Sequence, residues 1–169
     1  MGELTVGEHT YGQSHISRRG VDNNVVIGKF CSIAINVVID GGFNHNSKFV
    51  STYPFKSNFN LDVPSNTVCK GDIVIGSDVW ICENTLIMSG VKIGDGAIIG
   101  ANSIITHDVN PYSIVAGNPS HIIRYRFKPS EIEELLKIKW WDWDIEKIKE
   151  NGYLLNGGSI EDFINKHKI

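Results

Sequence analysis

Aliphatic side chains recur at every sixth position along two stretches of this chain. A second series, of modest-sized residues, stands four positions after nearly all of them. A period of six fits neither an amphipathic helix, which repeats about every 3.6 residues, nor a plain strand, which repeats about every two. The first series is Val21, Ile27, Ile33, Ile39, Ile75, Ile81, Ile87, Ile93, Ile99 and Ile105, and the second is Val25, Cys31, Val37, Val79, Thr85, Val91, Ala97, Ser103 and Val109.

These hexads predict short strands separated by turns, each hexad forming one face of a prism with its aliphatic side chain directed at the axis. Three hexads would then complete one coil. Val6, Gly7 and Thr10 match the template out of phase, which predicts an earlier partial coil followed by a loop through about Gly20. The alternative, a sandwich of short strands, would show turn signals about every 8–12 residues and more variable strand lengths.

Two segments depart from the hexads. The pattern stops after Asp40 and resumes in phase at Ile75, so a loop of about residues 41–72 is predicted to leave the prism, and long loops on rigid scaffolds often carry function. Further along, Ser130 and Glu133 predict a capping box at the start of a helix. The apolar face of that helix carries Ile132, Leu135, Leu136 and Ile138.

The remaining tail is also predicted to be helical. A second short helix over residues 144–151 would carry Ile145 and Ile148 inward, and Trp140, Trp141 and Trp143 are predicted to pin the tail to the prism rather than bind a ligand. We therefore interpret the chain as one domain, with the prism over residues 1–127 and a helical extension of the same domain over residues 128–169.

Composition narrows the functional classes. The 169 residues are 41% hydrophobic and 21% charged, as in an ordinary globular protein, and the net charge of −3 gives no general attraction for nucleic acid. We expect a cytoplasmic protein without a membrane span, because the chain has neither a signal-peptide pattern at its start nor an apolar run of about 20 residues. Three cysteines without a CxxC pair suggest neither disulfides nor a zinc ribbon, and Cys31 and Cys82 are interpreted as core residues.

Over about residues 21 to 117 the hexads resemble those of the hexapeptide-repeat acyltransferases. More narrowly, four segments look like the xenobiotic acetyltransferase branch: Gly41-Gly42-Phe43-Asn44-His45 with Ser51-Thr52-Tyr53-Pro54-Phe55, Ile75-Gly76-Ser77-Asp78-Val79-Trp80-Ile81, the stretch 111–119, and Trp140-Trp141-Asp142-Trp143. That branch includes enzymes that acetylate chloramphenicol and streptogramins, and relatives thought to modify sugars. The resemblance implies an all-β solenoid, the left-handed parallel β-helix, with acetyl coenzyme A along its wall. It also implies a homotrimer whose sites are shared between neighbouring subunits.

His45 is the candidate catalytic base. It matches the family's catalytic histidine, which lies in the protruding loop just before the Ser-Thr-Tyr-Pro-Phe-like run. Acetyl transfer needs a base that removes the acceptor's proton, and imidazole suits that role near neutral pH. The alternative is a solvated loop histidine. Whether a carboxylate or a backbone carbonyl orients the ring is left open by the sequence.

The coenzyme site is carried over from the same resemblance. Ala101 and Thr106 match positions that contact the pantetheine arm, Arg124 matches a basic residue that meets the phosphates, and Trp80 would lie on the wall near the thiol end. For each of these, packing or solvent exposure is the alternative. His107 stands where relatives often have lysine, and His121 where some relatives have a second basic residue, so their charge near neutral pH would be partial.

No metal is expected. The zinc-dependent carbonic anhydrases that share the prism need three histidines around one ion, whereas His45, His107 and His121 include no closely spaced pair. A non-catalytic β-helix that binds a partner or saccharide is the alternative of another class, and release of thiol from acetyl coenzyme A would separate it from an enzyme.

The acceptor is predicted to be a sugar or saccharide. Drug-acetylating relatives carry a longer segment between their first coil and the Ile-Gly-Lys-Phe-Cys-Ser-like run, and only about fifteen residues separate Tyr11 from Ile27 here. A more open site would suit a sugar, on whose face Tyr53 and Phe55 are predicted to stack. Acetylation of chloramphenicol or a streptogramin is the alternative.

Overall fold

Three sheets of parallel strands make up the body of the protein. The computed structural model describes residues 2–13, 16–19, 23–42 and 44–168. One sheet has the order β1 (Leu4–Val6), β3 (Val25–Ile27), β8 (Ile73–Ile75) and β11 (Lys92–Ile93). The second has the order β13 (Ile104–Ile105), β10 (Leu86–Ile87), β5 (Val37–Asp40) and β2 (Ile16–Arg19). The third has the order β15 (Ser120–Tyr125), β14 (Ser113–Gly117), β12 (Ile98–Ile99), β9 (Trp80–Ile81) and β4 (Ser32–Ile33), with an antiparallel β14–β15 pair.

From β3 to β5, and again from β8 to β13, consecutive strands visit the three sheets in turn, and the pairing register follows the hexads. Ile75 pairs with Ile93 and Ile81 with Ile99, so each partner lies eighteen residues, or three hexads, further along the chain. This eighteen-residue register is the one that three hexads per turn predict.

Both series of the hexad pattern form the core of the prism. The described residues of the aliphatic series and all of the modest-sized series are buried, with Cys31 fully enclosed. Val21 lies outside the described residues. The interpretation of Cys82 as a core residue is wrong, because it directly follows β9 and is only partly buried.

The first coil is more complete than the sequence predicts. Instead of a loop up to about Gly20, β2 pairs along β5, with Ile16 opposite Val37, and Tyr11 bridges to Ser32. The physical reason is that the edge of β5 offers unpaired backbone groups. The partly buried Ile16 also packs against the core.

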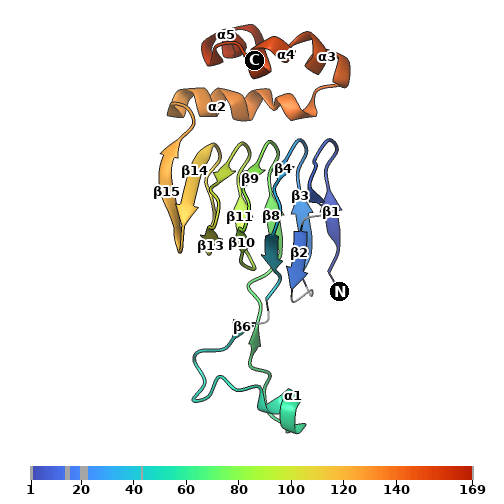
Figure 1. Ribbon diagram of the computed structural model, residues 1–169, viewed down its shortest axis with the longest axis vertical. Coiled ribbons are helices and arrows are strands. Elements are labelled where there is room, and N and C mark those ends of the chain that lie inside the picture. Colours follow the sequence, from blue (N-terminus) through green and yellow to red (C-terminus); the bar gives the residue numbers. More distant parts are fainter. Residues whose placement is uncertain (1, 14–15, 20–22, 43, 169) are drawn as a thin grey trace.

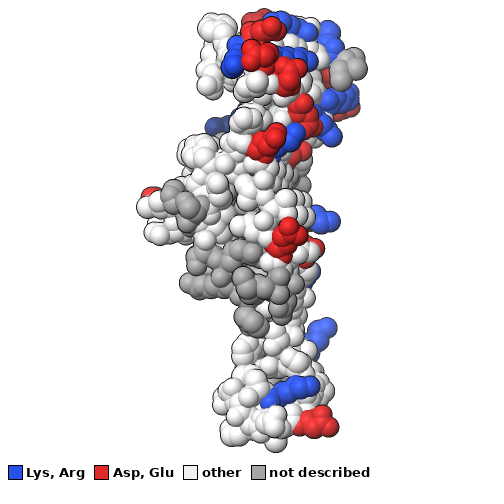
Figure 2. Space-filling model, turned by 90° about the vertical axis from the view of Figure 1, so that its right-hand side faces the viewer, with Lys and Arg blue, Asp and Glu red and all other residues white. Residues whose placement is uncertain are grey.

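A set of helices, here called the helical cap (residues 129–167), covers one side of the prism, along the row of turns at one end of the strands (Figure 1). It consists of α2 (Pro129–Ile138), a 3₁₀ turn (Trp140–Asp142), α3 (Ile145–Glu150), α4 (Gly152–Asn156) and α5 (Ile160–His167). The cap has its own apolar cluster, of Tyr112, Leu135, Ile138, Trp141 and Phe163. Charged side chains gather over this end of the molecule (Figure 2).

The start of α2 differs from the prediction. The backbone N–H of Lys128 donates to the carboxylate of Glu131 at 2.8 Å, so Glu131 and not Glu133 closes the first turn. Pro129 explains the shift, because a proline at the first helical position loses no hydrogen bond there. Ser130 therefore lies inside the helix rather than capping it.

Trp140 pins the cap to the prism as predicted, whereas the ring contacts of Trp143 are with Phe163 and His167 of the cap itself. The ring centroids of Phe30 and Trp140 lie 5.0 Å apart, and Trp141 is buried. The inward placement of Ile145 is wrong: it is 45% exposed, while Ile148 is partly buried. Asp144 caps α3 by accepting from the Lys147 N–H, which places Ile145 at the solvent-facing start of the helix. Among the described residues, no helix is long and apolar enough to cross a membrane.

Candidate active site

The segment between β5 and β8, here called the arm (residues 41–72), projects from the side of the prism opposite the helical cap (Figure 1). At its neck, β6 (Asn44–His45) pairs antiparallel with β7 (Thr67–Val68), which sets His45 opposite Thr67. Further out, α1 (Phe55–Phe59) forms a single short helix. The arm therefore carries His45 on a short two-strand ladder close to the side of the prism from which the arm leaves.

The imidazole of His45 is exposed, and its Nδ1 makes a short contact with the backbone carbonyl of Thr52. The side-chain amide of Asn66 meets both groups. Its Nδ2 donates to the Thr52 carbonyl at 2.5 Å and lies 3.2 Å from His45 Nδ1. The group that orients the ring, left open by the sequence, is thus a backbone carbonyl.

A cavity of about 360 Å³ opens beside His45. Thr106, predicted for the coenzyme, lines the same cavity, so the structure brings these two predicted residues together. Lys48 and Lys70 line it as well, and within the described residues no carboxylate does. The full lining is Asn44, His45, Asn46, Ser47, Lys48, Val68, Lys70, Met88, Ser89 and Thr106.

The other residues predicted for the coenzyme are not part of the lining of this cavity. Trp80 is 51% exposed on β9, and Arg124 is exposed on β15 of the same sheet, where its Nη1 donates to the Tyr125 carbonyl at 3.2 Å. Ala101 is exposed in the turn after β12. His107 Nδ1 lies 2.8 Å from the hydroxyl of Thr106, in the turn after β13.

Tyr53 and Phe55 form an exposed aromatic surface on the arm. Their ring centroids lie 5.0 Å apart in an edge-on arrangement. They line a second hollow, of about 340 Å³, together with the apolar side chains of Leu61 and Val63. Asn66 also lines this hollow, so it lies between the aromatic surface and His45.

Asn66 is a residue that the sequence did not identify. It sits in the polar run Ser65-Asn66-Thr67, which reads as an ordinary loop. Its relation to His45 arises only when β6 and β7 pair, twenty-one residues apart. The sequence contains no local signal that would have separated it from the other asparagines of the arm.

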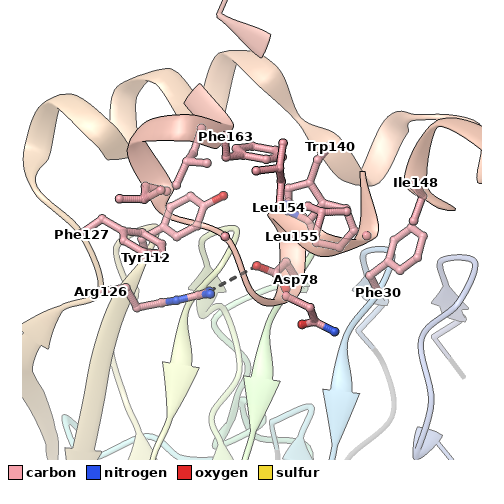
Figure 3. Close-up of a pocket in the computed structure, with 15 residues that line it drawn as sticks. Phe30, Asp78, Tyr112, Arg126, Phe127, Trp140, Ile148, Leu154, Leu155 and Phe163 are labelled. Carbon is pink, nitrogen blue, oxygen red and sulfur yellow. Dashed lines mark hydrogen bonds and ion pairs between the residues drawn. The ribbon is translucent and has the colours of Figure 1, made fainter. Parts of the chain in front are cut away.

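A larger cavity, of about 420 Å³, lies between the prism and the helical cap (Figure 3). Asp78 and Arg126 meet there with Nη1 and Oδ2 3.2 Å apart, and Arg126 also donates to the Gly96 carbonyl at 2.6 Å. Burial raises the pKa of Asp78, and the Arg126 guanidinium opposes that rise. The lining is otherwise mostly apolar, and its one carboxylate is paired, so the described residues there offer no free base. We interpret this cavity as the joint between cap and prism.

The hydroxyl of Tyr112 is sealed in the same joint. It is buried, and the described part of the chain offers it no hydrogen-bond partner. The pKa of that hydroxyl is raised, chiefly by burial.

In the described residues, no group of three or more His, Cys, Asp or Glu side chains is placed to hold a metal ion.

Comparison with known proteins gives one family. A sequence profile described as bacterial transferase hexapeptide (six repeats) matches residues 72–107. A probable macrolide acetyltransferase of Lysinibacillus sphaericus is 44% identical, over 87% of this chain and 86% of the relative. A chloramphenicol acetyltransferase of Agrobacterium fabrum is 40% identical, over 93% and 84%. A virginiamycin A acetyltransferase of Staphylococcus aureus is 41% identical, over 98% and 83%.

Solved structures agree with these relatives. A hexapeptide-repeat acetyltransferase of Vibrio cholerae, complexed with acetyl coenzyme A, is 28% identical with a TM-score of 0.60, and the match covers 74% of this chain and 61% of that one. A polySia-specific acetyltransferase is 26% identical with a TM-score of 0.58, over 90% and 64%. This chain thus spans less than two thirds of each of those two structures.

Proposed function

This chain belongs to the hexapeptide-repeat acetyltransferases, in the branch that includes the chloramphenicol and virginiamycin acetyltransferases, and from that premise we propose that it moves an acetyl group from acetyl coenzyme A to a hydroxyl or amine of a small acceptor, with His45 as the base. The observation that carries the proposal is the cavity that His45 and Thr106 share. A base and a coenzyme-binding wall must meet at one place for this reaction, and these two residues do.

The hydrogen bonds of His45 support its role. If Nδ1–H donates to the Thr52 carbonyl, then Nε2 carries the free lone pair and accepts a proton. In the proposed step, Nε2 removes the acceptor's proton while the acceptor oxygen or nitrogen forms a bond to the thioester carbonyl carbon. The carbon–sulfur bond then breaks, and the imidazolium returns the proton to the leaving sulfur.

We propose that acetyl coenzyme A lies along the prism wall, in contact with Trp80, Ala101, Thr106, His107 and Arg124. The half-exposed indole of Trp80 offers a flat apolar surface to the chain of the coenzyme, and the exposed Arg124 offers paired donors to a phosphate. Trp80 and Arg124 share one sheet, whereas Thr106 follows a strand of another. A site that uses all of them is easiest to build between two copies of the chain.

A homotrimer is therefore part of the proposal. The arm reaches away from the prism and exposes apolar side chains along its length: Phe49, Val50, Tyr53, Phe55, Phe59, Leu61 and Val63. Contiguous apolar surface of this kind usually marks an interaction site. In a trimer the arm of one subunit would lie against the wall of the next, and His45 would face coenzyme groups bound there.

We propose that the three sheets form a left-handed β-helix, as the family implies, within a single domain that spans the prism with its arm (residues 1–127) and the helical extension (128–169). The supply of acetyl coenzyme A makes the cytoplasm the proposed compartment.

Substitution of Arg124 by alanine should raise the KM for acetyl coenzyme A about tenfold and leave kcat nearly unchanged, because a charge-assisted hydrogen bond to phosphate acts in binding. If the phosphate is the 3′-phosphate, the KM for the dephospho donor should change less. Steady-state kinetics with both donors measure this. Lys92→Ala, which removes an exposed cation from another sheet, is the control. Equal changes in the KM values of the two donors would show that Arg124 does not contact the 3′-phosphate.

For the acceptor we propose a sugar or saccharide, including a nucleotide-linked sugar. The exposed rings of Tyr53 and Phe55 are suited to a pyranose face. Lys48 and Lys70 line the His45 cavity without a carboxylate among its described residues, which favours an acceptor that carries a negative charge. Part of the connection between β1 and β3 also pairs along β5, as β2.

An antibiotic is the second candidate, because the relatives at 40–44% identity are named for chloramphenicol, macrolide and virginiamycin acetylation. The deciding measurement is kcat/KM at saturating acetyl coenzyme A, followed by release of the coenzyme thiol. The acceptors are chloramphenicol, a streptogramin, a macrolide, neutral sugars and nucleotide-linked sugars. We expect the highest value for a sugar. A drug value well above every sugar value would establish antibiotic acetylation, and no thiol release with any acceptor would favour a binding protein.

A further inference from the structure

We propose that Asn66 is a positioning residue for His45: its side-chain amide holds the Thr52 carbonyl against Nδ1, which keeps the imidazole in the tautomer that leaves Nε2 free. This inference rests on the proposed function, since it assumes that His45 is the base. It names the residue of this chain that makes the base competent.

Burial sets Asn66 apart from the rest of the arm. Within residues 44–72, all of which the structure describes, Asn66 alone is buried, at 7% exposure. A buried amide destabilises the fold unless its donors and acceptor are used. Here the Nδ2 donates to the Thr52 carbonyl, and the backbone carbonyl of Asn66 accepts from the Asn46 N–H at 2.7 Å. Asn66 directly precedes Thr67, the ladder partner of His45. It is bonded through its side chain to Thr52 and through its backbone to Asn46, the residue after His45.

The contacts among His45, Thr52 and Asn66 allow one consistent assignment of hydrogens. If Nδ1 accepted a hydrogen from Asn66, it would have to face the Thr52 carbonyl lone pair to lone pair at a short contact, which is repulsive. If Nδ1–H donates to the carbonyl instead, the Asn66 amide donates to the second lone pair of the same oxygen. Both contacts to the Thr52 carbonyl are then hydrogen bonds, and Nε2 is the free base.

Thr52 needs such an anchor. It is exposed and lies in a stretch without helix or strand, between the turn after β6 and the start of α1. The amide of Asn66 connects its carbonyl to the ordered neck of the arm, next to β7. Without that bond the carbonyl is free to turn away, the ring loses its Nδ1 partner, and both tautomers are populated.

Asn66→Leu tests the role with little change of volume. We expect kcat to fall about 10- to 100-fold, since a mis-set base loses part of the 10²- to 10⁴-fold that general base catalysis supplies, while the KM for acetyl coenzyme A stays within about twofold. The acceptor is the one with the highest kcat/KM in the panel above. Asn151→Leu is the matched control, because Asn151 is also buried and its amide also donates to a backbone carbonyl, that of Lys147, but it lies in the helical cap.

Two readouts separate positioning from folding. The ring ¹⁵N shifts of His45, assigned with the His45→Gln variant, should show the Nδ1–H tautomer in the wild type and a mixture in Asn66→Leu, without any acceptor present. In Asn66→Asp, the carboxylate can accept the Nδ1 proton itself, so we expect at least fivefold more activity than in Asn66→Leu. If Asn66 only supported the fold by donating to Thr52, the acceptor-only aspartate would be no better than leucine.

The outcomes also separate this inference from the proposed function. Loss of activity in His45→Gln with normal kcat and an unchanged tautomer in Asn66→Leu would overturn the role of Asn66 and keep His45 as the base. Normal kcat in His45→Gln would remove the base itself, and the role of Asn66 with it. An Asp variant as poor as the Leu variant would assign Asn66 to the fold of the arm.

Discussion

Replacement of His45 by alanine is expected to lower kcat about a hundredfold or more and to leave the affinity for acetyl coenzyme A within a few-fold. A base acts on the acceptor's proton in the transition state, so its loss affects turnover rather than donor binding. The side chain is exposed on β6, and its removal leaves no buried cavity. Pre-steady-state or steady-state release of the coenzyme thiol gives kcat, and donor binding is measured separately by calorimetry.

The controls for this prediction follow from the geometry. His45→Gln keeps a polar side chain of similar reach but supplies no base, and should be as inactive as alanine. His9→Asn removes a histidine of the prism that stacks on Phe30, and asparagine tolerates the positive φ of 62° at that position. It should retain wild-type turnover. Near-normal turnover in both His45 variants would remove His45 from the mechanism.

The prism could be predicted from the sequence because its order is local and repetitive. Each hexad supplies one buried aliphatic side chain, and the same spacing sets the eighteen-residue register that pairs Ile75 with Ile93. Where the pattern is out of phase, prediction failed: the residues after Tyr11 were expected to be a loop, yet β2 pairs with β5. Backbone hydrogen bonding at an open edge, which leaves no mark in a hydrophobic pattern, decided that segment.

The candidate site was predictable only in part, for a related reason. The resemblance singled out His45, and the structure adds the cavity that His45 shares with Thr106. The Thr52 carbonyl and the Asn66 amide could not be predicted, because a carbonyl carries no residue identity and Asn66 looks like any loop asparagine. Contacts made by the backbone or by single polar residues across a long loop depend on the tertiary fold and not on spacing.

At the other end of the molecule, the contact between Asp78 and Arg126 also could not be predicted from the sequence. They are forty-eight residues apart in sequence, and the turn between β8 and β9 brings Asp78 under the residues that lead into α2. Arg126 also lies over the rings of Tyr112 and Phe127, at 5.3 and 5.2 Å from their centroids. The ion pair therefore connects the prism to the first residues of the helical cap (Figure 3).

Substitution of Arg126 by methionine is expected to lower the free energy of unfolding by about 2–3 kcal/mol at pH 7. Removal of one partner of a buried ion pair leaves an uncompensated charge, which costs about 3–5 kcal/mol when burial is complete. Both side chains here are 26% exposed, so the expected loss is smaller. Lys29→Met is the matched control, because it breaks the more exposed Lys29–Asp142 pair between prism and cap and should cost less than about 1 kcal/mol.

The loss of unfolding free energy in Arg126→Met should become smaller as the pH falls, because the pKa of Asp78 is raised in the folded state. Burial raises the pKa of Asp78 above its unfolded value, so its ionisation destabilises the folded state as the pH rises from the unfolded to the folded pKa. Arg126 opposes that rise, and its removal extends the loss to higher pH. Below the unfolded pKa both states are protonated, and only the bond to Gly96 and the ring contacts are missing. Denaturant titrations at pH 7 and at about pH 3, below the unfolded pKa of Asp78, measure the difference, and Asp78→Asn combined with Arg126→Met should recover part of the loss at pH 7. A loss that is equal at both pH values, or no larger than that of Lys29→Met, would show that the pair does not hold the cap to the prism.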